Sequence, residues 1–142
     1  LKQKPLPLAK DLEITLAGHS GAYRVISKII AYAKIQEVFL FDALYGGNEN
    51  YMKWMAASEK HRFINIYTKD GGTLDNSMLV AKELKTKWDL NPVLVDEKKL
   101  TNLQLLYSQI LFIYSPLQHN EVVGYENNLQ RYLKSRDLYH SR

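Results

Sequence analysis

Four polar residues of the chain have the types that nucleophilic catalysis uses: Ser20, Asp42, Asp70 and His119. A serine hydroxyl is a weak nucleophile near neutral pH unless an imidazole beside it accepts its proton. The imidazole in turn needs a carboxylate, which fixes its tautomer and stabilises the charged ring. These residue types predict a serine nucleophile with a histidine base, provided that the fold brings them together.

The residues around Ser20 favour an exposed position for its hydroxyl. Residues 11–17 are rich in apolar residues and predict a strand, and a helix is expected from about Gly21 onwards. The turn between them is very tight, and the small residues Gly18 and Ala22 would let the helix pack close to the strand. The backbone N–H of Gly21 would then lie beside Ser20, where it could stabilise an oxyanion.

The rest of the chain alternates between short apolar runs and amphipathic segments, without an internal repeat. Residues 98–108 are ambiguous and predict a short turn or helical bend, whereas the prolines within residues 1–10 favour an extended arm. The expected strands are 11–17, 37–43, 63–68, 92–96 and 109–115, and the expected helices are 21–34, 48–60, 76–88 and 121–134. This alternation predicts an α/β fold, a three-layer sandwich with a mostly parallel sheet of about five strands.

Such a sheet would collect the four candidate residues at one edge. Each follows a predicted strand, and right-handed crossovers place the carboxyl ends of all parallel strands on the same side. Two aspartates could orient His119. Asp42 closes a fully apolar strand, where a carboxylate without a partner would be costly. Asp70 precedes Gly71-Gly72, which is also a plain turn signal. We slightly favour Asp42, and both alternatives remain open at this point.

The segment Gly18-His19-Ser20-Gly21-Ala22 resembles the nucleophile elbow, Gly-x-Ser-x-Gly, of the α/β-hydrolase superfamily, with Ala22 in place of the last glycine. The order serine, aspartate, histidine is also that of the superfamily. The resemblance implies a serine hydrolase that cleaves an ester or amide through an acyl-enzyme. Ser20 would be the nucleophile and His119 the general base and acid. In most of the superfamily the acid matches Asp70, and in a known variant it matches Asp42.

The resemblance covers most of the chain but only the second half of the hydrolase fold, from the elbow onward. We therefore expect residues 1–142 to form a single α/β domain, the C-terminal part of a longer α/β-hydrolase domain. The missing strands would lie upstream of Leu1 or in another chain. The second oxyanion donor would come from that earlier half, so the fragment could be inactive alone. Residues 45–60 would be either a short cover over an acyl pocket or an ordinary packed helix.

The amino-acid composition limits the kinds of partner and site that are expected for this chain. Hydrophobic residues make up 46% of the chain, which is typical of a globular domain, and there is no cysteine for a disulfide or a thiolate site. The net charge of +4 is spread along the chain, so nucleic acid is not an expected partner. No apolar run approaches the roughly 20 residues of a membrane span. His19, His61 and His140 lack the spacing of a metal site, and no cofactor is expected.

The expected partner is thus a small-molecule or peptide substrate. Two other functions stay open. One is a non-catalytic binding or interaction module built on the same fold, since fold does not determine function. The other is a nucleotide-binding domain, which residues 18–21 could serve by approaching a phosphate at a helix N-terminus. Nucleotide binding is the least favoured of these functions, because the chain lacks the glycine-rich motifs of such domains.

Overall fold

The computed structural model describes residues 12–32 and 34–140, and the predicted extended arm lies outside these residues. A single parallel sheet of five strands forms the middle layer, in the order β1-β2-β3-β5-β4. The strands are β1 (Ile14–His19), β2 (Ile35–Phe41), β3 (Arg62–Thr68), β4 (Val93–Asp96) and β5 (Ile110–Ser115). The predicted α/β class and parallel sheet are confirmed.

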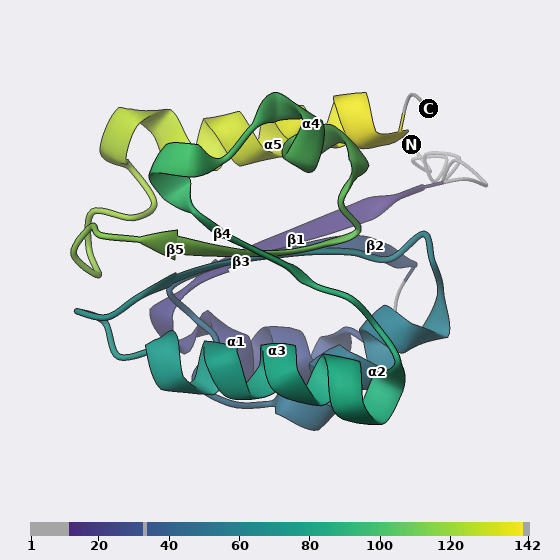
Figure 1. The fold of residues 1–142 in the computed structure, drawn as a ribbon. Coiled ribbons are helices and arrows are strands. Elements are labelled where there is room, and N and C mark those ends of the chain that lie inside the picture. The colour runs from purple at the N-terminus through teal and green to yellow at the C-terminus, as the bar shows by residue number, and fades with distance from the viewer. Residues whose placement is uncertain (1–11, 33, 141–142) are drawn as a thin grey trace, which may run out of the picture.

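Helices cover both faces of the sheet (Figure 1). In this view α1, α2 and α3 lie below the sheet, and α4 and α5 lie above it. The helices are α1 (Tyr23–Ile29), α2 (Asn48–Ala57), α3 (Leu74–Trp88), α4 (Asn102–Tyr107) and α5 (Asn128–His140). Short 3₁₀ turns cover Ser20–Ala22, Glu97–Lys99 and Tyr125–Asn127. The architecture is the predicted three-layer sandwich.

The central strands are apolar on both faces because each face has its own core. In β2, Val38 and Leu40 pack toward α1, α2 and α3, whereas Phe39 and Phe41 face the opposite core with Tyr132 of α5. Successive side chains of a strand point to opposite faces, so a strand covered on both sides reads as a continuous apolar run. This explains why the run 38–41 predicted a central strand correctly.

The order of the strands reverses at one side of the sheet. The chain passes from β1 through β2 and β3 to β4 at the far edge, and β5 then returns to the position between β3 and β4. The helices α1, α2 and α3 follow β1, β2 and β3 on one face, whereas α5 follows β5 on the other face. The loops after β3 and β5 therefore leave the sheet in opposite directions. Ligands of open α/β sheets commonly bind in the crevice that such a reversal opens.

Helix α1 differs from the sequence prediction. Ile26 and Ile30 are buried, but Val25 is 61% exposed and Ile29 is 39% exposed, so the expected apolar face is only partly covered. The reason lies in the topology: β1 is an edge strand, and α1 therefore has sheet and neighbouring helix on one side only. Helix α1 also ends earlier than expected, at Ile29.

Helix starts were predicted less accurately than the helices themselves. Gly47, with φ of 73°, precedes α2 and occupies its N-cap position. Thr73 occupies the N-cap position of α3, which begins at Leu74, two residues before the predicted start. The last helix begins at Asn128, later than the predicted 121, because the preceding turn includes a residue with positive φ. Leu79, an apolar residue of α3, is 47% exposed.

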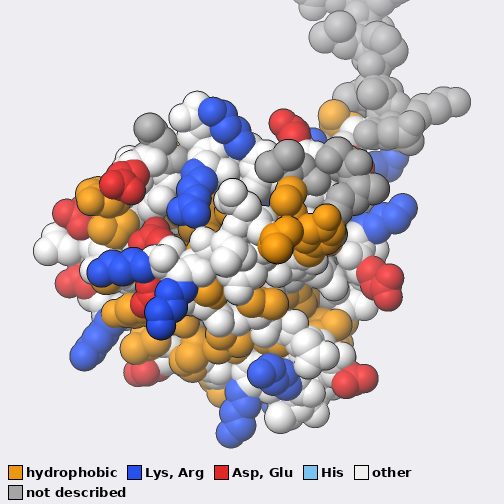
Figure 2. All heavy atoms as spheres, turned by 45° about the horizontal axis from the view of Figure 1, so that its top comes forward, with side chains coloured by type: hydrophobic (Ala, Val, Ile, Leu, Met, Phe, Trp, Pro, Cys, Tyr) orange, Lys and Arg blue, Asp and Glu red, His pale blue; other side chains and the backbone are white. Residues whose placement is uncertain are grey.

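Helix α2 is an ordinary packed helix, the second of the two alternatives for residues 45–60. Its apolar side chains face the core below the sheet and are almost fully buried: Tyr51, Met52, Trp54 and Met55. None of the described helices is both long enough and apolar enough to cross a bilayer. On the face shown in Figure 2, basic and acidic side chains are interspersed among apolar ones.

Candidate functional site

Ser20 lies on a strained turn directly after β1. Its backbone has φ of 55°, in the left-handed region that residues other than glycine rarely adopt. Ser20 begins the 3₁₀ turn that leads into α1, so the serine separates a strand from a helix. A left-handed residue with a Cβ costs on the order of 1–2 kcal/mol, and such strain is concentrated at functional sites.

The residues around Ser20 show why small side chains occupy this turn. A Cβ on Gly18 would lie 2.9 Å from the Cβ of Ala22 and 2.5 Å from Ile26 Cδ1, so α1 packs directly against the end of β1. Gly21 differs, since a Cβ there would meet no atom within 4 Å. The predicted oxyanion donor therefore lies beside open space.

Asp42 directly follows β2 and is completely buried. Its carboxylate accepts hydrogen bonds from the Thr68 backbone N–H (3.2 Å), from the Thr68 hydroxyl (2.8 Å) and from the Thr73 hydroxyl. The Asp42 backbone also has a positive φ, of 47°, and its N–H donates to the carbonyl of Ile66 (2.7 Å). The buried oxygens of the carboxylate thus all have hydrogen-bond donors.

His119 provides a further donor to this carboxylate. Its Nδ1 lies 2.6 Å from Asp42 Oδ2, although the two residues are 77 positions apart in the chain. Because an ionised carboxylate only accepts, Nδ1 must carry the proton of this bond. In the neutral ring Nε2 is then unprotonated, as a general base requires. The His119 side chain is 25% exposed, so it remains reachable from solvent.

Asp70 contacts the same histidine through its main chain. Asp70 Oδ2 accepts a hydrogen bond from the backbone N–H of His119 (3.2 Å). The two aspartates thus hold different parts of one residue, Asp42 the ring and Asp70 the backbone. Of the two alternatives left open by the sequence, the contact with the imidazole belongs to Asp42.

Two more aromatic residues surround His119. The His19 ring lies 4.5 Å from the His119 ring, and its Nε2 is 2.8 Å from the carbonyl oxygen of His119. The Tyr45 hydroxyl donates to the carbonyl of Gly71 (2.6 Å) and lies 3.4 Å from His119 Nδ1. Burial, followed by the negative charge of Asp42, raises the pKa of Tyr45, which therefore remains protonated at neutral pH.

The structure brings Asp42, Asp70 and His119 into direct contact, and it places Ser20 at the same edge through its neighbour His19. It does not join all four residues. Among the described residues no hydrogen bond links the Ser20 hydroxyl to His119. Catalytic hydrogen bonds are often long in ligand-free structures and shorten when substrate binds.

The sequence missed three residues that hold the Asp42–His119 pair. Thr68 and Thr73 donate to the carboxylate, and Thr73 makes no capping bond to α3. A Cβ on Gly71 would lie 1.7 Å from Asp42 Oδ2 and 2.8 Å from His119 Nδ1, so only glycine leaves room for the pair. The two threonines flank the 69–72 loop, but nothing in their spacing points to Asp42, which lies 26 positions before Thr68 and 31 before Thr73.

A cavity of about 410 Å³ adjoins these residues where the sheet order reverses. It is lined by Lys69 and Asp70 after β3 and by residues 114–117 around the end of β5. Within the described part of the chain, no group of three or more His, Asp or Glu side chains could hold a metal ion. The side-chain groups that meet at this edge are hydroxyl, imidazole and carboxylate groups.

Comparison with known proteins adds no relative to this picture. No family model, no curated protein and no solved structure matches the chain.

Proposed function

We propose that this chain carries the catalytic residues of a serine hydrolase that cleaves an ester or amide through an acyl-enzyme. The observation that carries the proposal is the 2.6 Å bond between Asp42 and His119 at the edge where Ser20 has a positive φ. The bond leaves Nε2 of a neutral His119 free to accept a proton, and the half-buried Ser20 lies on the turn at the start of a helix.

In the proposed reaction Ser20 Oγ attacks the substrate carbonyl while His119 Nε2 takes the hydroxyl proton. Asp42 stabilises the resulting imidazolium, and the Gly21 N–H donates to the oxyanion. His119 then protonates the leaving group, and water attacks the acyl-enzyme with His119 again as base. Asp70 and His19 hold the backbone of His119 in place. The 410 Å³ cavity beside Asp70 is the proposed binding site for part of the substrate.

The proposal keeps the relationship to the second half of an α/β-hydrolase. Strand β1 is at the edge of the sheet, with the proposed nucleophile directly after it. A second oxyanion donor would then come from strands that pair with β1, and the loss of one donor typically reduces the rate about 10²–10³-fold.

The alternative is a binding module without catalysis. The missing hydrogen bond between the Ser20 hydroxyl and His119 favours it, because the proposed base is not bonded to the proposed nucleophile. On this alternative the buried Asp42–His119 pair holds the loops at the sheet edge together and has no chemical role.

A fluorophosphonate probe distinguishes the two functions, since it reacts covalently only with an activated serine. We expect labelling of the folded protein, located at Ser20 by peptide mass spectrometry and absent in Ser20→Ala. His119→Asn should reduce the labelling rate about 10²–10⁴-fold, the usual contribution of a general base. Ser108→Ala, at the end of α4, is the matched control and should label normally. Absence of labelling in the correctly folded full-length protein, which supplies any strands that pair with β1, would exclude the hydrolase.

Variants of the two aspartates identify the orienting acid in the same labelling assay. Asp42→Asn removes the ionised partner of Nδ1 and should reduce the labelling rate far more than Asp70→Asn, which leaves the ring contact intact. If Asp70→Asn has the larger effect, the orienting acid is Asp70, and the contact between Asp42 and His119 is structural.

A further inference from the structure

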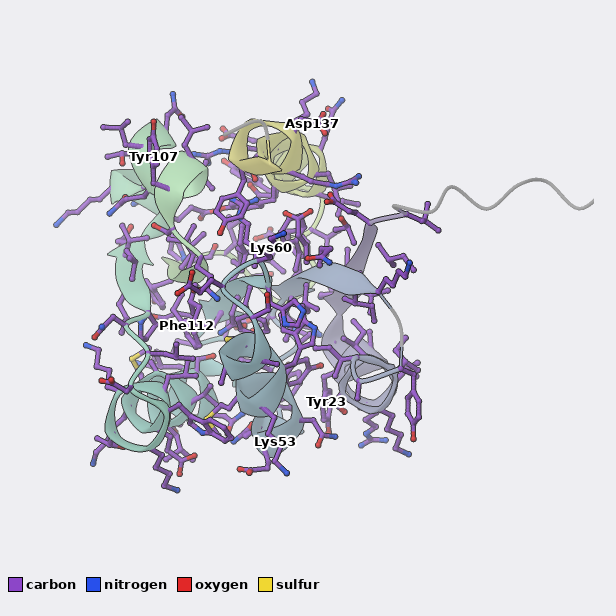
Figure 3. The ribbon with its side chains drawn as sticks, turned by 90° about the vertical axis from the view of Figure 1, so that its right-hand side faces the viewer. Tyr23, Lys53, Lys60, Tyr107, Phe112 and Asp137 are labelled. Atoms are coloured by element: carbon purple, nitrogen blue, oxygen red, sulfur yellow. The ribbon has the colours of Figure 1, made fainter. Side chains whose placement is uncertain are left out.

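A second cavity lies away from Ser20 and His119. It has a volume of about 500 Å³ and is lined by residues of α1 and α2 together with His61. His61 directly precedes β3, whereas Asp42 and Asp70 follow strands, so this cavity belongs to the opposite edge of the sheet. Figure 3 looks onto this end of the molecule, with α2, which carries Lys53, below the sheet and α1 beside it.

One wall of the cavity is a rigid pair of aromatic rings. Trp54 and His61 stack with their centroids 4.4 Å apart and their planes only 6° from parallel. His61 Nδ1 lies 2.6 Å from the carbonyl oxygen of Trp54, so the carbonyl accepts a proton held on Nδ1 and fixes the orientation of the ring. Ile30 and Ala57 add apolar surface beside this pair. The wall is thus formed before any ligand binds.

Two lysines, Lys28 and Lys53, line the cavity together with His61 and Tyr32. None of the described residues that line it is acidic. Glu49 lies 3.9 Å from Lys53, but both side chains are about two-thirds exposed (64% and 65%), so water screens that pair. The charge of the cavity is therefore complementary to an anion.

We propose that this cavity binds a small molecule in which a carboxylate or phosphate group is attached to a flat apolar body. The apolar body lies against His61, Ala57 and the small exposed part of Trp54, and the anionic group is held between Lys28 and Lys53. The cavity volume is within the range of about 300–1,000 Å³ that small-molecule sites have. This site is separate from the proposed catalytic residues and does not depend on them.

Tryptophan fluorescence tests the proposal directly with 2-naphthoate as the probe. The chain has two tryptophans, Trp54 and Trp88, so the Trp88→Phe protein reports on the cavity alone. We expect saturable quenching by 2-naphthoate and by 2-naphthyl phosphate. The uncharged 2-naphthylmethanol, which has the same rings, should bind about tenfold more weakly, since it lacks the charge that the lysines recognise.

Variants of the lysines locate the site. Lys28→Gln and Lys53→Gln should each weaken 2-naphthoate about two- to fivefold, as expected for partly exposed ion pairs, and the double variant more. Lys99→Gln, an exposed lysine between β4 and α4, is the matched control and should bind normally. Amide chemical-shift changes on titration should cluster on α1, α2 and residue 61.

Absence of saturable quenching by 2-naphthoate would overturn the proposal. So would an affinity for 2-naphthylmethanol equal to that for 2-naphthoate, or unchanged binding of 2-naphthoate by the double lysine variant. Chemical-shift changes confined to other elements would also overturn it. Binding should be the same in Ser20→Ala, so the outcome here is independent of the hydrolase test.

Discussion

Gly71 is the residue that most sharply limits the geometry of the candidate site. Its Cα faces both the Asp42 carboxylate and the imidazole of His119, at distances that leave no room for a methyl group. In the sequence, Asp70-Gly71-Gly72 is a turn signal like many others. The spatial requirement arises because the 69–72 loop passes over the end of β2.

We therefore predict that Gly71→Ala breaks the Asp42–His119 bond. The new methyl group should displace one of the two side chains and reduce fluorophosphonate labelling about 100-fold or more, comparable to the loss of the base itself. The downfield proton signal of His119 Nδ1–H, expected for a 2.6 Å bond to a carboxylate, should disappear. Gly124→Ala, where a Cβ meets no atom within 4 Å, is the matched control and should leave both readouts unchanged.

Wild-type labelling in a folded Gly71→Ala protein would mean that the pair has no part in activating Ser20. Circular dichroism establishes whether the variant is folded. Loss of the proton signal with unchanged labelling would separate the structural role of the pair from the proposed catalytic one.

At the scale of elements, a buried ion cluster links α5 to the sheet. Glu37 of β2 is fully buried, and it accepts hydrogen bonds from the Thr15 hydroxyl (2.9 Å) and from Arg62 Nη1 (3.3 Å). Arg136 of α5 approaches the same carboxylate at 3.2 Å, and Arg62 also donates to Ser135 (3.2 Å). One carboxylate thus connects β1, β2, β3 and α5.

Glu37→Ala should destabilise the protein strongly, because the guanidinium of Arg62 would stay buried without its carboxylate. We expect a loss of about 3–5 kcal/mol in the free energy of unfolding, measured by urea denaturation. Glu49→Ala removes an exposed carboxylate 3.9 Å from Lys53 and should cost no more than about 0.5 kcal/mol. Similar effects of the two variants would contradict a structural role for the cluster.

Over the whole molecule, each of the two cores contains a buried tyrosine. Tyr51 lies below the sheet and its hydroxyl donates to the carbonyl of Tyr23 (3.0 Å), whereas the Tyr132 hydroxyl in the other core makes no hydrogen bond among the described residues. Burial raises the pKa of both tyrosines above the ordinary value of about 10. The unfolded chain therefore loses these protons at a lower pH than the folded chain.

The stability that these tyrosines contribute should be complete below about pH 10 and should fall as the pH rises through their raised pKa values. Urea denaturation at pH 7 and pH 11 checks this. Tyr51→Phe and Tyr132→Phe should each reduce the loss between the two pH values. At pH 7, Tyr51→Phe should cost about 1 kcal/mol through its lost hydrogen bond, and Tyr132→Phe should be neutral or stabilising. An equal alkaline loss in wild type and both variants would contradict this assignment.

The sequence by itself determined the fold class and the edge at which the candidate residues meet. Continuous apolar runs such as 38–41 are sufficient to place buried parallel strands, and the chirality of crossovers then collects Ser20, Asp42, Asp70 and His119. It did not determine which parts of α1 are exposed, because the exposure of Val25 depends on β1 being at the edge of the sheet.

Only the tertiary structure decided which aspartate meets the imidazole and which residues hold the pair. Asp42 and His119 are 77 positions apart, and the threonines and Gly71 that surround them come from a third segment. A local sequence pattern indicates the periodicity of a strand or helix and the residues that favour a turn. Contacts within about 3 Å between distant loops depend on strand order and loop path, which no single segment of the chain encodes.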